Sequence, residues 1–451
     1  MNPLLACRLI PLDKSPGLRP IGIGEVLRRI IGKSVMSIIR DDVGIAAGSL
    51  QLCAGQPSGC EAAVHAVREI FKDEDCDGVI LVDASNAFNS INRKAMLHNI
   101  GILCPAMKIF TENCYSTSAR LFITGGAEIR SNEGTTQGDP VASPMYAVAL
   151  TPLLDCLISQ MGRDGTMVRN VAFADDLNGT GKLQGLLHWW KCVCEYGPII
   201  GYFPKPSKSW LIVKPSMIHQ AHNIFKNSGI NITSDGKKHL GAAIGSEDFK
   251  TEFVIEKVLL WVNEIMNLAE IAKKDPHSAY CAFTHGLKHN YTYTLRTIPH
   301  IKDLLQPLEN AIRDHFIPAI TRNHLCNDVE RKLLSLPPKL GGLGIINPME
   351  IVEEQFENST KVTESLKDQI ILQNTIYKPN KQNKILNDIK GRKLSRNNRI
   401  LGEVKETVSS ATKLCVEIAQ SNGASIDVFA YKRRRFPSKQ KGILGCCFSS
   451  V

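Results

Sequence analysis

Short apolar runs alternate with helix-like periodicities through the first half of the chain. Residues 77 to 83, DGVILVD, predict a buried strand, because β-favouring apolar residues stand between polar ends. Residues 84 to 103 show the spacing of an amphipathic helix, with Asn89 or Ser90 as the expected N-cap. The pattern predicts three further elements: a hairpin and Gly-rich loop at 119–140, a long apolar helix at 143–161 and a second hairpin at 171–180. Irregular alternation of this kind between about 75 and 225 predicts an α+β fold, with an antiparallel sheet covered by helices.

Beyond about residue 250 the pattern becomes wholly helical. Residues 248 to 274 and 301 to 320 both repeat apolar positions at intervals of three and four. Residues 336 to 348, LPPKLGGLGIINP, are rich in Pro and Gly and predict a boundary. The sequence after them is polar and rich in Asn and Lys.

Charge is concentrated at the C-terminal end. The chain has 451 residues and a formal net charge of +10, yet residues 361 to 451 hold 18 Lys and Arg against 7 Asp and Glu. The rest of the chain therefore carries a net charge of −1. A basic tail suits a polyanionic partner, and it is equally typical of a solvated, partly disordered end.

Composition also bears on the compartment. No apolar run approaches the roughly 18 residues that span a bilayer, and the N-terminus has no signal-peptide pattern, so no membrane partner is expected. The cysteines are scattered without a zinc-ligand spacing, which favours reduced thiols in an intracellular protein. The basic run at 431–441, YKRRRFPSKQK, is a candidate nuclear-localisation or nucleic-acid patch.

Three carboxylates are the strongest candidates for chemistry. Asp83 ends the first predicted strand, and Asp175 and Asp176 stand side by side at the tip of the second hairpin. If one sheet contains both elements, the three acids converge, and such a cluster is costly unless cations neutralise it. Mg²⁺ prefers oxygen donors and is usually completed by water and substrate phosphates. The alternative reading of the Asp pair alone is a polar turn.

The motifs around these acids resemble those of reverse transcriptases, specifically the enzymes of non-LTR retrotransposons and group II introns. The resemblance covers roughly residues 8 to 348 and rests on motifs in a fixed order. In chain order they are LIPLDKSPGLRPI at 9–21, LVDASNAF at 81–88, TTQGDPVASP at 135–144, FADD at 173–176, GYFPKPSKS at 201–209, KHLGAAIG at 238–245 and LPPKLGGLGI at 336–345.

The resemblance implies a catalytic and metal-binding set. Asp83 and Asp175 would be the principal ligands of two Mg²⁺ ions, for which Mn²⁺ is a possible substitute, and Asp176 would be the third acid. Lys208 would protonate or neutralise the leaving pyrophosphate; its alternative is a surface lysine. The family often has Tyr where this chain has Phe173.

The resemblance also implies a nucleotide pocket. Phe88 would lie beneath the sugar and exclude a 2′-hydroxyl, or else be an aromatic core residue. Gln137 and Gly138 would line the pocket, where Gly lets the backbone approach closely. Lys14 and Arg19 would clamp the triphosphate, with Lys14 alternatively a surface charge.

The implied architecture is a right-hand polymerase. Its expected parts are N-terminally truncated fingers at 1–75, a palm at 76–225 with a fingers insertion at about 95–133, a helical thumb at 226–348 and a basic, partly disordered extension at 349–451. The expected partners are an RNA template, a DNA or RNA primer and dNTPs. Two alternatives stay open: an inactive nucleic-acid-binding remnant, and an RNA-dependent RNA polymerase, against which Phe88 argues.

Overall fold

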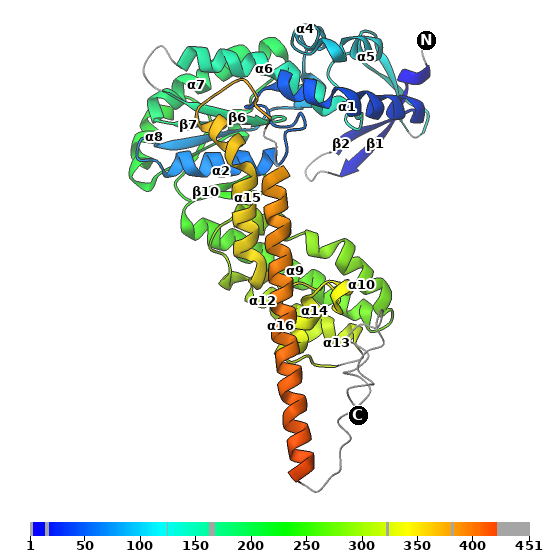
Figure 1. Ribbon diagram of the computed structural model, residues 1–451. Coiled ribbons are helices and arrows are strands. Elements are labelled where there is room, and N and C mark those ends of the chain that lie inside the picture. Colours follow the sequence, from blue (N-terminus) through cyan, green and yellow to red (C-terminus); the bar gives the residue numbers. More distant parts are fainter. Residues whose placement is uncertain are drawn as a thin grey trace. The chain divides into compact units, whose positions relative to one another are not determined.

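The computed structural model describes residues 3–13, 18–123, 125–161, 167–321, 324–379 and 383–421 (Figure 1). Lys14 and the basic run 431–441 lie outside these residues. The chain divides into two compact units. The first contains Met1–Lys250 and Ser359–Lys381, and the second contains Thr251–Asn358 and Gln382–Val451.

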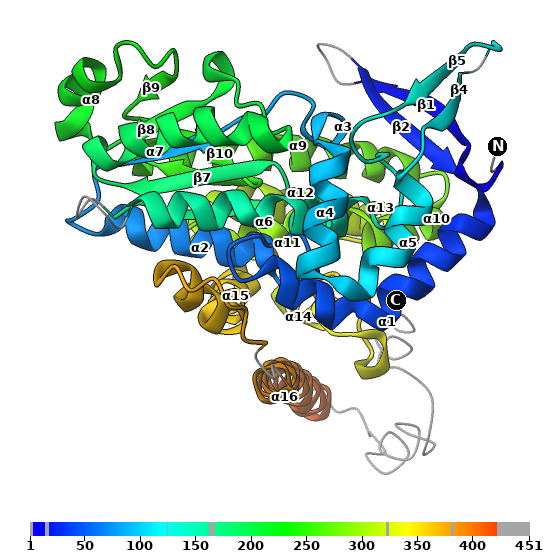
Figure 2. The ribbon, with the colours of Figure 1, turned by 90° about the horizontal axis from the view of Figure 1, so that it is seen from above.

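A five-stranded sheet forms the centre of the first unit. Its strand order is β6-β7-β3-β8-β9, antiparallel except for the β8–β9 pair. The bounds are β3 Gly78–Val82, β6 Arg169–Phe173, β7 Asp176–Gly181, β8 Trp210–Val213 and β9 Asn231–Thr233. Helices α2 (Gly59–Lys72), α6 (Ala142–Met161) and α7 (Leu183–Tyr196) pack against this sheet, and α8 (Ile218–Phe225) packs against α7 and β9 (Figures 1 and 2). The predicted α+β class, with a largely antiparallel sheet covered by helices, is confirmed.

A second sheet, of four strands, lies in the same unit and has the order β2-β1-β4-β5 (Figure 2). Its strands are β1 Cys7–Asp13, β2 Leu18–Gly24, β4 Ala119–Ile123 and β5 Glu128–Ser131. The β4–β5 pair is the hairpin predicted from residue 119 onward. The other helices of this part of the chain are α1 Val26–Ala47, α3 Ala87–Ser90, α4 Arg93–Leu103 and α5 Pro105–Tyr115. Strands β10 Gly236–His239 and β11 Ala242–Gly245 form a short separate hairpin.

The helix predicted over 84–103 is interrupted between α3 and α4. The Asn92 amide donates to the Ile200 carbonyl at 2.8 Å, so this backbone group bonds to another segment rather than along a helix. The Asn92 side chain then accepts from the Ala95 amide at 2.9 Å and caps α4. The expected cap at Asn89 or Ser90 is therefore wrong.

Helix α6 is the main buried helix of the first unit. Tyr146, Val148, Leu150 and Leu157 are fully buried in the core. Among the described helices, α6 passes the length and composition test for crossing a membrane, over Ala142–Gln160 with a mean hydropathy of 1.3, although the sequence reading found no run near that length. Since 61% of this window is buried inside the protein, its apolarity is accounted for by the core.

Part of the predicted C-terminal extension belongs to the core of the first unit. Helix α15 runs over Pro348–Ile371, and its residues from Ser359 onward lie in this unit. Leu366 and Ile370 are buried in the core cluster. The Ser359 hydroxyl donates to Glu61 of α2 at 2.6 Å and lies 2.9 Å from His65 Nε2. The sequence analysis predicts a partly disordered extension here because the segment is mostly polar. Only the spacing of its few apolar residues indicates a packed helix.

All regular secondary structure in the described residues of the second unit is helical. Its helices are most of α9 Glu247–Ala272, then α10 Pro276–His285, α11 Thr292–Thr297, α12 Gln306–Ala311, α13 Ile317–Ile320, α14 Asp328–Ser335, the start of α15 and α16 Asn383–Ser421. Phe283 and Phe316 stack in its core with ring centroids 4.8 Å apart. Arg331 of α14 and Glu309 of α12 form a buried ion pair with N–O distances of 2.6 and 2.7 Å. The helical pattern predicted beyond residue 250 is confirmed.

Candidate active site

Strand register brings the three predicted carboxylates to one end of the five-stranded sheet. The β3–β7 ladder ends at the pair Val82–Leu177. At that end, Asp83 follows Val82 on the β3 side, and Asp176 precedes Leu177 in β7. The β6–β7 ladder ends at the pair Phe173–Asp176, so Asp175 lies in the turn that joins these strands. Antiparallel pairing thus places a strand end beside a hairpin tip.

The charges of all three acids act on the hydroxyl of one buried tyrosine, Tyr202. The Tyr202 hydroxyl donates to the Asp175 carbonyl at 3.0 Å. Burial raises the pKa of Tyr202 well above its ordinary value, and the charges of Asp175, Asp176 and Asp83 raise it further. The three carboxylates therefore lie within electrostatic reach of one hydroxyl. Asp83 and Asp176 are exposed and Asp175 is half-buried.

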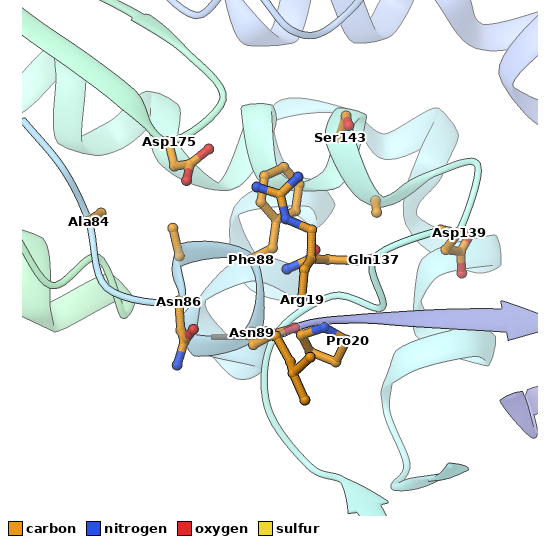
Figure 3. Close-up of a pocket in the computed structure, with 14 residues that line it drawn as sticks. Arg19, Pro20, Ala84, Asn86, Phe88, Asn89, Gln137, Asp139, Ser143 and Asp175 are labelled. Carbon is orange, nitrogen blue, oxygen red and sulfur yellow. The ribbon is translucent and has the colours of Figure 1, made fainter. Parts of the chain in front are cut away.

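A cavity of about 340 Å³ opens beside this sheet end (Figure 3). That volume is within the range of small-molecule sites. The Arg19 guanidinium and the Asp175 carboxylate project into it, and the Phe88 ring forms part of its wall (Figure 3). Its lining comes from separate segments: 18–20, 84 and 86–89, 137–139, 142–143, and Asp175.

Five of the predicted site residues line this cavity, and others do not. Arg19, Phe88, Gln137, Gly138 and Asp175 are brought together there. Asp83 and Asp176 do not line the cavity, although Ala84, next to Asp83, does.

The predicted lysines are placed less directly. Lys208 is exposed at the end of a 3₁₀ turn, Pro206–Lys208, and does not line the cavity. This turn is attached to the carboxylate end of β3, because the Lys205 amide donates to the Asp83 carbonyl at 2.7 Å. Lys14 lies outside the described residues, so its predicted role stays a prediction.

Close backbone packing explains the glycine at position 138. Gly138 has a φ of +106°, which favours glycine, and an added Cβ would lie 2.7 Å from the Gly22 carbonyl oxygen. The Gly22 amide in turn donates to the Gln137 carbonyl at 2.8 Å. Strand β2, which carries Arg19, is therefore attached directly to the loop that carries Gln137 and Gly138.

Phe88 is fixed by stacking rather than by full burial. Its ring lies 4.5 Å from the Tyr146 ring of α6, centroid to centroid, at an interplanar angle of 22°. Tyr146 is fully buried, while Phe88 is half-buried and lines the cavity. Phe88 is thus both part of the packed interior and part of the pocket wall.

A buried network anchors the same loop, and sequence reasoning missed it. Asp139, next to Gly138, forms an ion pair with Arg28 in which both side chains are 6% exposed. The Tyr115 hydroxyl also donates to Asp139 Oδ2 at 2.8 Å, and Asp139 Oδ1 accepts from the Val141 amide at 3.1 Å. The signal available in the sequence was weak: an Asp four positions before the start of the helix predicted at 143–161.

The donor chemistry of the sheet end fits a hard cation. Among the described residues, no three His, Cys, Asp or Glu side chains form a ready metal-binding group, so the predicted carboxylate trio is not drawn together as a closed site. Mg²⁺, however, is commonly held by one or two carboxylates, with waters and substrate phosphates as the remaining ligands. Asp175, which lines the cavity, and Asp83, at the same end of the sheet, offer such a donor set.

No protein-family model matches this sequence, and no curated protein matches it. Among solved structures, the chain is similar to telomerase from Candida albicans in complex with a TWJ fragment of telomeric RNA, at 10% identity and a TM-score of 0.39, over 80% of this chain and 64% of that chain. It is also similar to apo telomerase from Candida tropicalis, at 10% identity and a TM-score of 0.43, over 86% of this chain and 68% of that chain. Because both TM-scores are below 0.5, these likenesses assign no function to the chain.

Proposed function

We propose that the chain is a nucleotidyltransferase, an RNA-directed DNA polymerase that adds deoxynucleotides to the 3′ end of a primer. The observation that most supports this proposal is the meeting of separate chain segments at one cavity, which brings together Arg19, Phe88, Gly138 and Asp175. Each supplies something that nucleotide transfer requires. Arg19 supplies a cation for the phosphates, and Phe88 supplies a flat wall for the sugar. Gly138 allows the nucleotide to approach the backbone closely, and Asp175 supplies a carboxylate.

In this proposal the protein's own residues position the substrate. Arg19 binds the triphosphate with its planar guanidinium, and Gln137 and Gly138 form the floor on which the nucleotide rests. Phe88 lies beneath the sugar and leaves no room for a 2′-hydroxyl. Lys208, on a turn bonded to the Asp83 backbone through Lys205, neutralises the leaving pyrophosphate.

Two Mg²⁺ ions, with Mn²⁺ as a substitute, would be held by Asp83 and Asp175, with Asp176 as the third acid. Bound there, the ions would stabilise charge on the attacking and leaving oxygens of the transfer. The partners that fit this activity are an RNA template, a DNA or RNA primer and dNTPs. The ordered motifs support the narrower proposal of a polymerase of the non-LTR retrotransposon or group II intron type.

Phe88→Val is expected to let ribonucleotides into the active site. Shortening the side chain opens space beneath the sugar, so the ratio of kcat/KM for dNTP over rNTP should fall by roughly tenfold or more. Single-nucleotide primer extension measures this ratio. Phe110→Val is the matched control, because Phe110 is also a half-buried core aromatic but does not line the cavity. An unchanged ratio in Phe88→Val would make Phe88 a packing residue only.

Gly138→Ala is expected to lower dNTP incorporation by roughly tenfold or more, because the loop must move away from β2 to accommodate the methyl group. Gly126→Ala is the control: Gly126 has a similar φ of +94°, but an added Cβ there meets nothing within 4 Å. Both variants carry the strain of a left-handed alanine, and only Gly138→Ala carries the clash. Equal activity of the two variants in primer extension would show that this close approach does not shape the pocket.

A further inference from the structure

The turn that presents Asp175 contains a residue in an unfavourable backbone conformation. Ala174 and Asp175 form the two-residue connection between β6 and β7. Such tight hairpins need a positive φ at their first central residue, where glycine is usual. Ala174 has a φ of +54°, in the left-handed region that costs free energy for a residue with a Cβ. Something in the surrounding structure must hold this turn in place.

The side chain of Gln51 makes that contact. Its Nε2 donates to the Ala174 carbonyl at 3.0 Å, and its Oε1 accepts from the Ala174 amide at 3.0 Å. One amide side chain therefore satisfies both backbone groups of the strained residue. Gln51 is fully buried, with 0% of its surface exposed, so these bonds are shielded from water.

The backbone around Gln51 is itself anchored to the same strand. The Leu52 amide donates to the Ala172 carbonyl at 2.9 Å, and the Ala172 amide donates to the Leu50 carbonyl at 2.7 Å. The buried Gln56 side chain also donates to the Gln51 carbonyl at 2.9 Å. The backbone on both sides of Gln51 is thus hydrogen-bonded to β6, and its own carbonyl is bonded to Gln56. The turn at Ala174 is therefore constrained by a side chain whose backbone is fixed.

We infer that Gln51 is a positioning residue for Asp175: it holds Ala174 in the left-handed conformation that aims the next carboxylate into the cavity. This inference rests on the proposed polymerase function. It predicts that the two bonds of the Gln51 amide matter for catalysis because of the strain at Ala174. Relieving that strain should therefore compensate for their loss.

The test compares three variants in dNTP incorporation, with kcat and KM measured under steady-state conditions. Gln51→Met keeps the side-chain volume and removes both bonds to Ala174, together with a longer one from the Cys53 amide at 3.4 Å, so kcat should fall on the order of 100-fold with little change in KM for dNTP. Gln51→Met/Ala174→Gly should recover at least tenfold of that loss, because glycine adopts a positive φ without the penalty. Gln373→Met is the control: Gln373 accepts from the Asn170 amide at 2.9 Å and donates to the Asn170 carbonyl at 3.0 Å, at the other end of β6. It should retain kcat within about threefold, since the geometry of the Asp175 turn is untouched.

Equal loss in Gln51→Met and Gln373→Met, or no recovery with Ala174→Gly, would overturn the inference and leave Gln51 as a packing residue. A crystal structure of Gln51→Met gives a readout independent of activity. We expect residue 174 to leave the positive-φ region, and an unchanged turn would also overturn the inference. If the parent protein incorporates no nucleotide, the proposed function fails, while the conformation of residue 174 still decides the role of Gln51.

Discussion

Replacing Asp83 or Asp175 by Asn is expected to reduce dNTP incorporation by roughly a thousandfold or more, while the protein stays folded. The substitution keeps the size of the side chain and removes a charge on which the proposed cation binding at the sheet end would depend. A thousandfold loss corresponds to about 4 kcal/mol of transition-state stabilisation. Asp176→Asn should have a smaller effect, because in the proposed arrangement Asp176 is the third acid and Asp83 and Asp175 are the principal ligands of the two ions.

Asp75→Asn provides the matched control for charge alone. Asp75 precedes the opposite end of β3, and its side chain is 91% exposed. Single-turnover primer extension, with circular dichroism as the check on folding, measures the four variants side by side. Activity of Asp175→Asn within tenfold of the parent would rule out the assignment of this carboxylate.

The second large effect is expected on stability, in the helical unit. Arg331→Met should destabilise α12 and α14 by about 3–5 kcal/mol, because it leaves the Glu309 carboxylate buried without its partner. The two side chains are 5% and 7% exposed, and Arg331 also donates to the Ile345 carbonyl at 2.7 Å. Hydrogen exchange of the α12 and α14 amides, followed by mass spectrometry, measures the loss locally.

The pH dependence of this defect has a defined sign. Burial raises the pKa of Glu309, and Arg331 is the partner that lowers it. Without Arg331, the pKa of Glu309 in the folded protein exceeds its value in the unfolded chain by a larger margin than in the parent protein. The variant therefore loses stability as pH rises from the ordinary glutamate pKa, about 4.5, through the raised pKa of the folded state, and its defect should grow over that interval.

Lys273→Met is the control for the stability prediction, since its ion pair with Glu270 is exposed at both ends, at 58% and 67%. It should cost less than about 1 kcal/mol. The double variant Arg331→Met/Glu309→Met should recover most of the loss by removing the unpaired charge. A defect in Arg331→Met no larger than that in Lys273→Met would contradict the account of this pair.

Local patterns in the sequence were enough to predict the elements that carry the candidate site. The run at 77–83 corresponds to β3, and the apolar segment from 143 corresponds to most of α6. The hairpin predicted at 171–180 corresponds to β6 and β7. Each depends on side-chain periodicity, which is local information. The motifs that resemble those of reverse transcriptases then indicated which residues at the ends of these elements to compare, including Asp83 and Asp175.

The residues that hold the site in place had no such pattern. Gln51 and Asp139 are polar residues whose partners lie more than a hundred positions away, at Ala174 and Arg28 respectively. No periodicity marks a side chain that is buried because it bonds to a distant backbone or guanidinium group. The return of residues 359–379 to the first unit was missed for the same reason, because its contacts are long-range and its composition is polar.

The most direct test of the central proposal is primer extension by the purified 451-residue chain on an RNA template. The reaction contains a DNA primer and Mg²⁺, with all dNTPs or all rNTPs, and the Asp175→Asn protein prepared in parallel excludes a contaminating polymerase. We predict template-directed extension with dNTPs, little extension with rNTPs and loss of extension in Asp175→Asn. Extension with rNTPs alone, or no extension by the folded parent protein with either Mg²⁺ or Mn²⁺, would contradict an RNA-directed DNA polymerase.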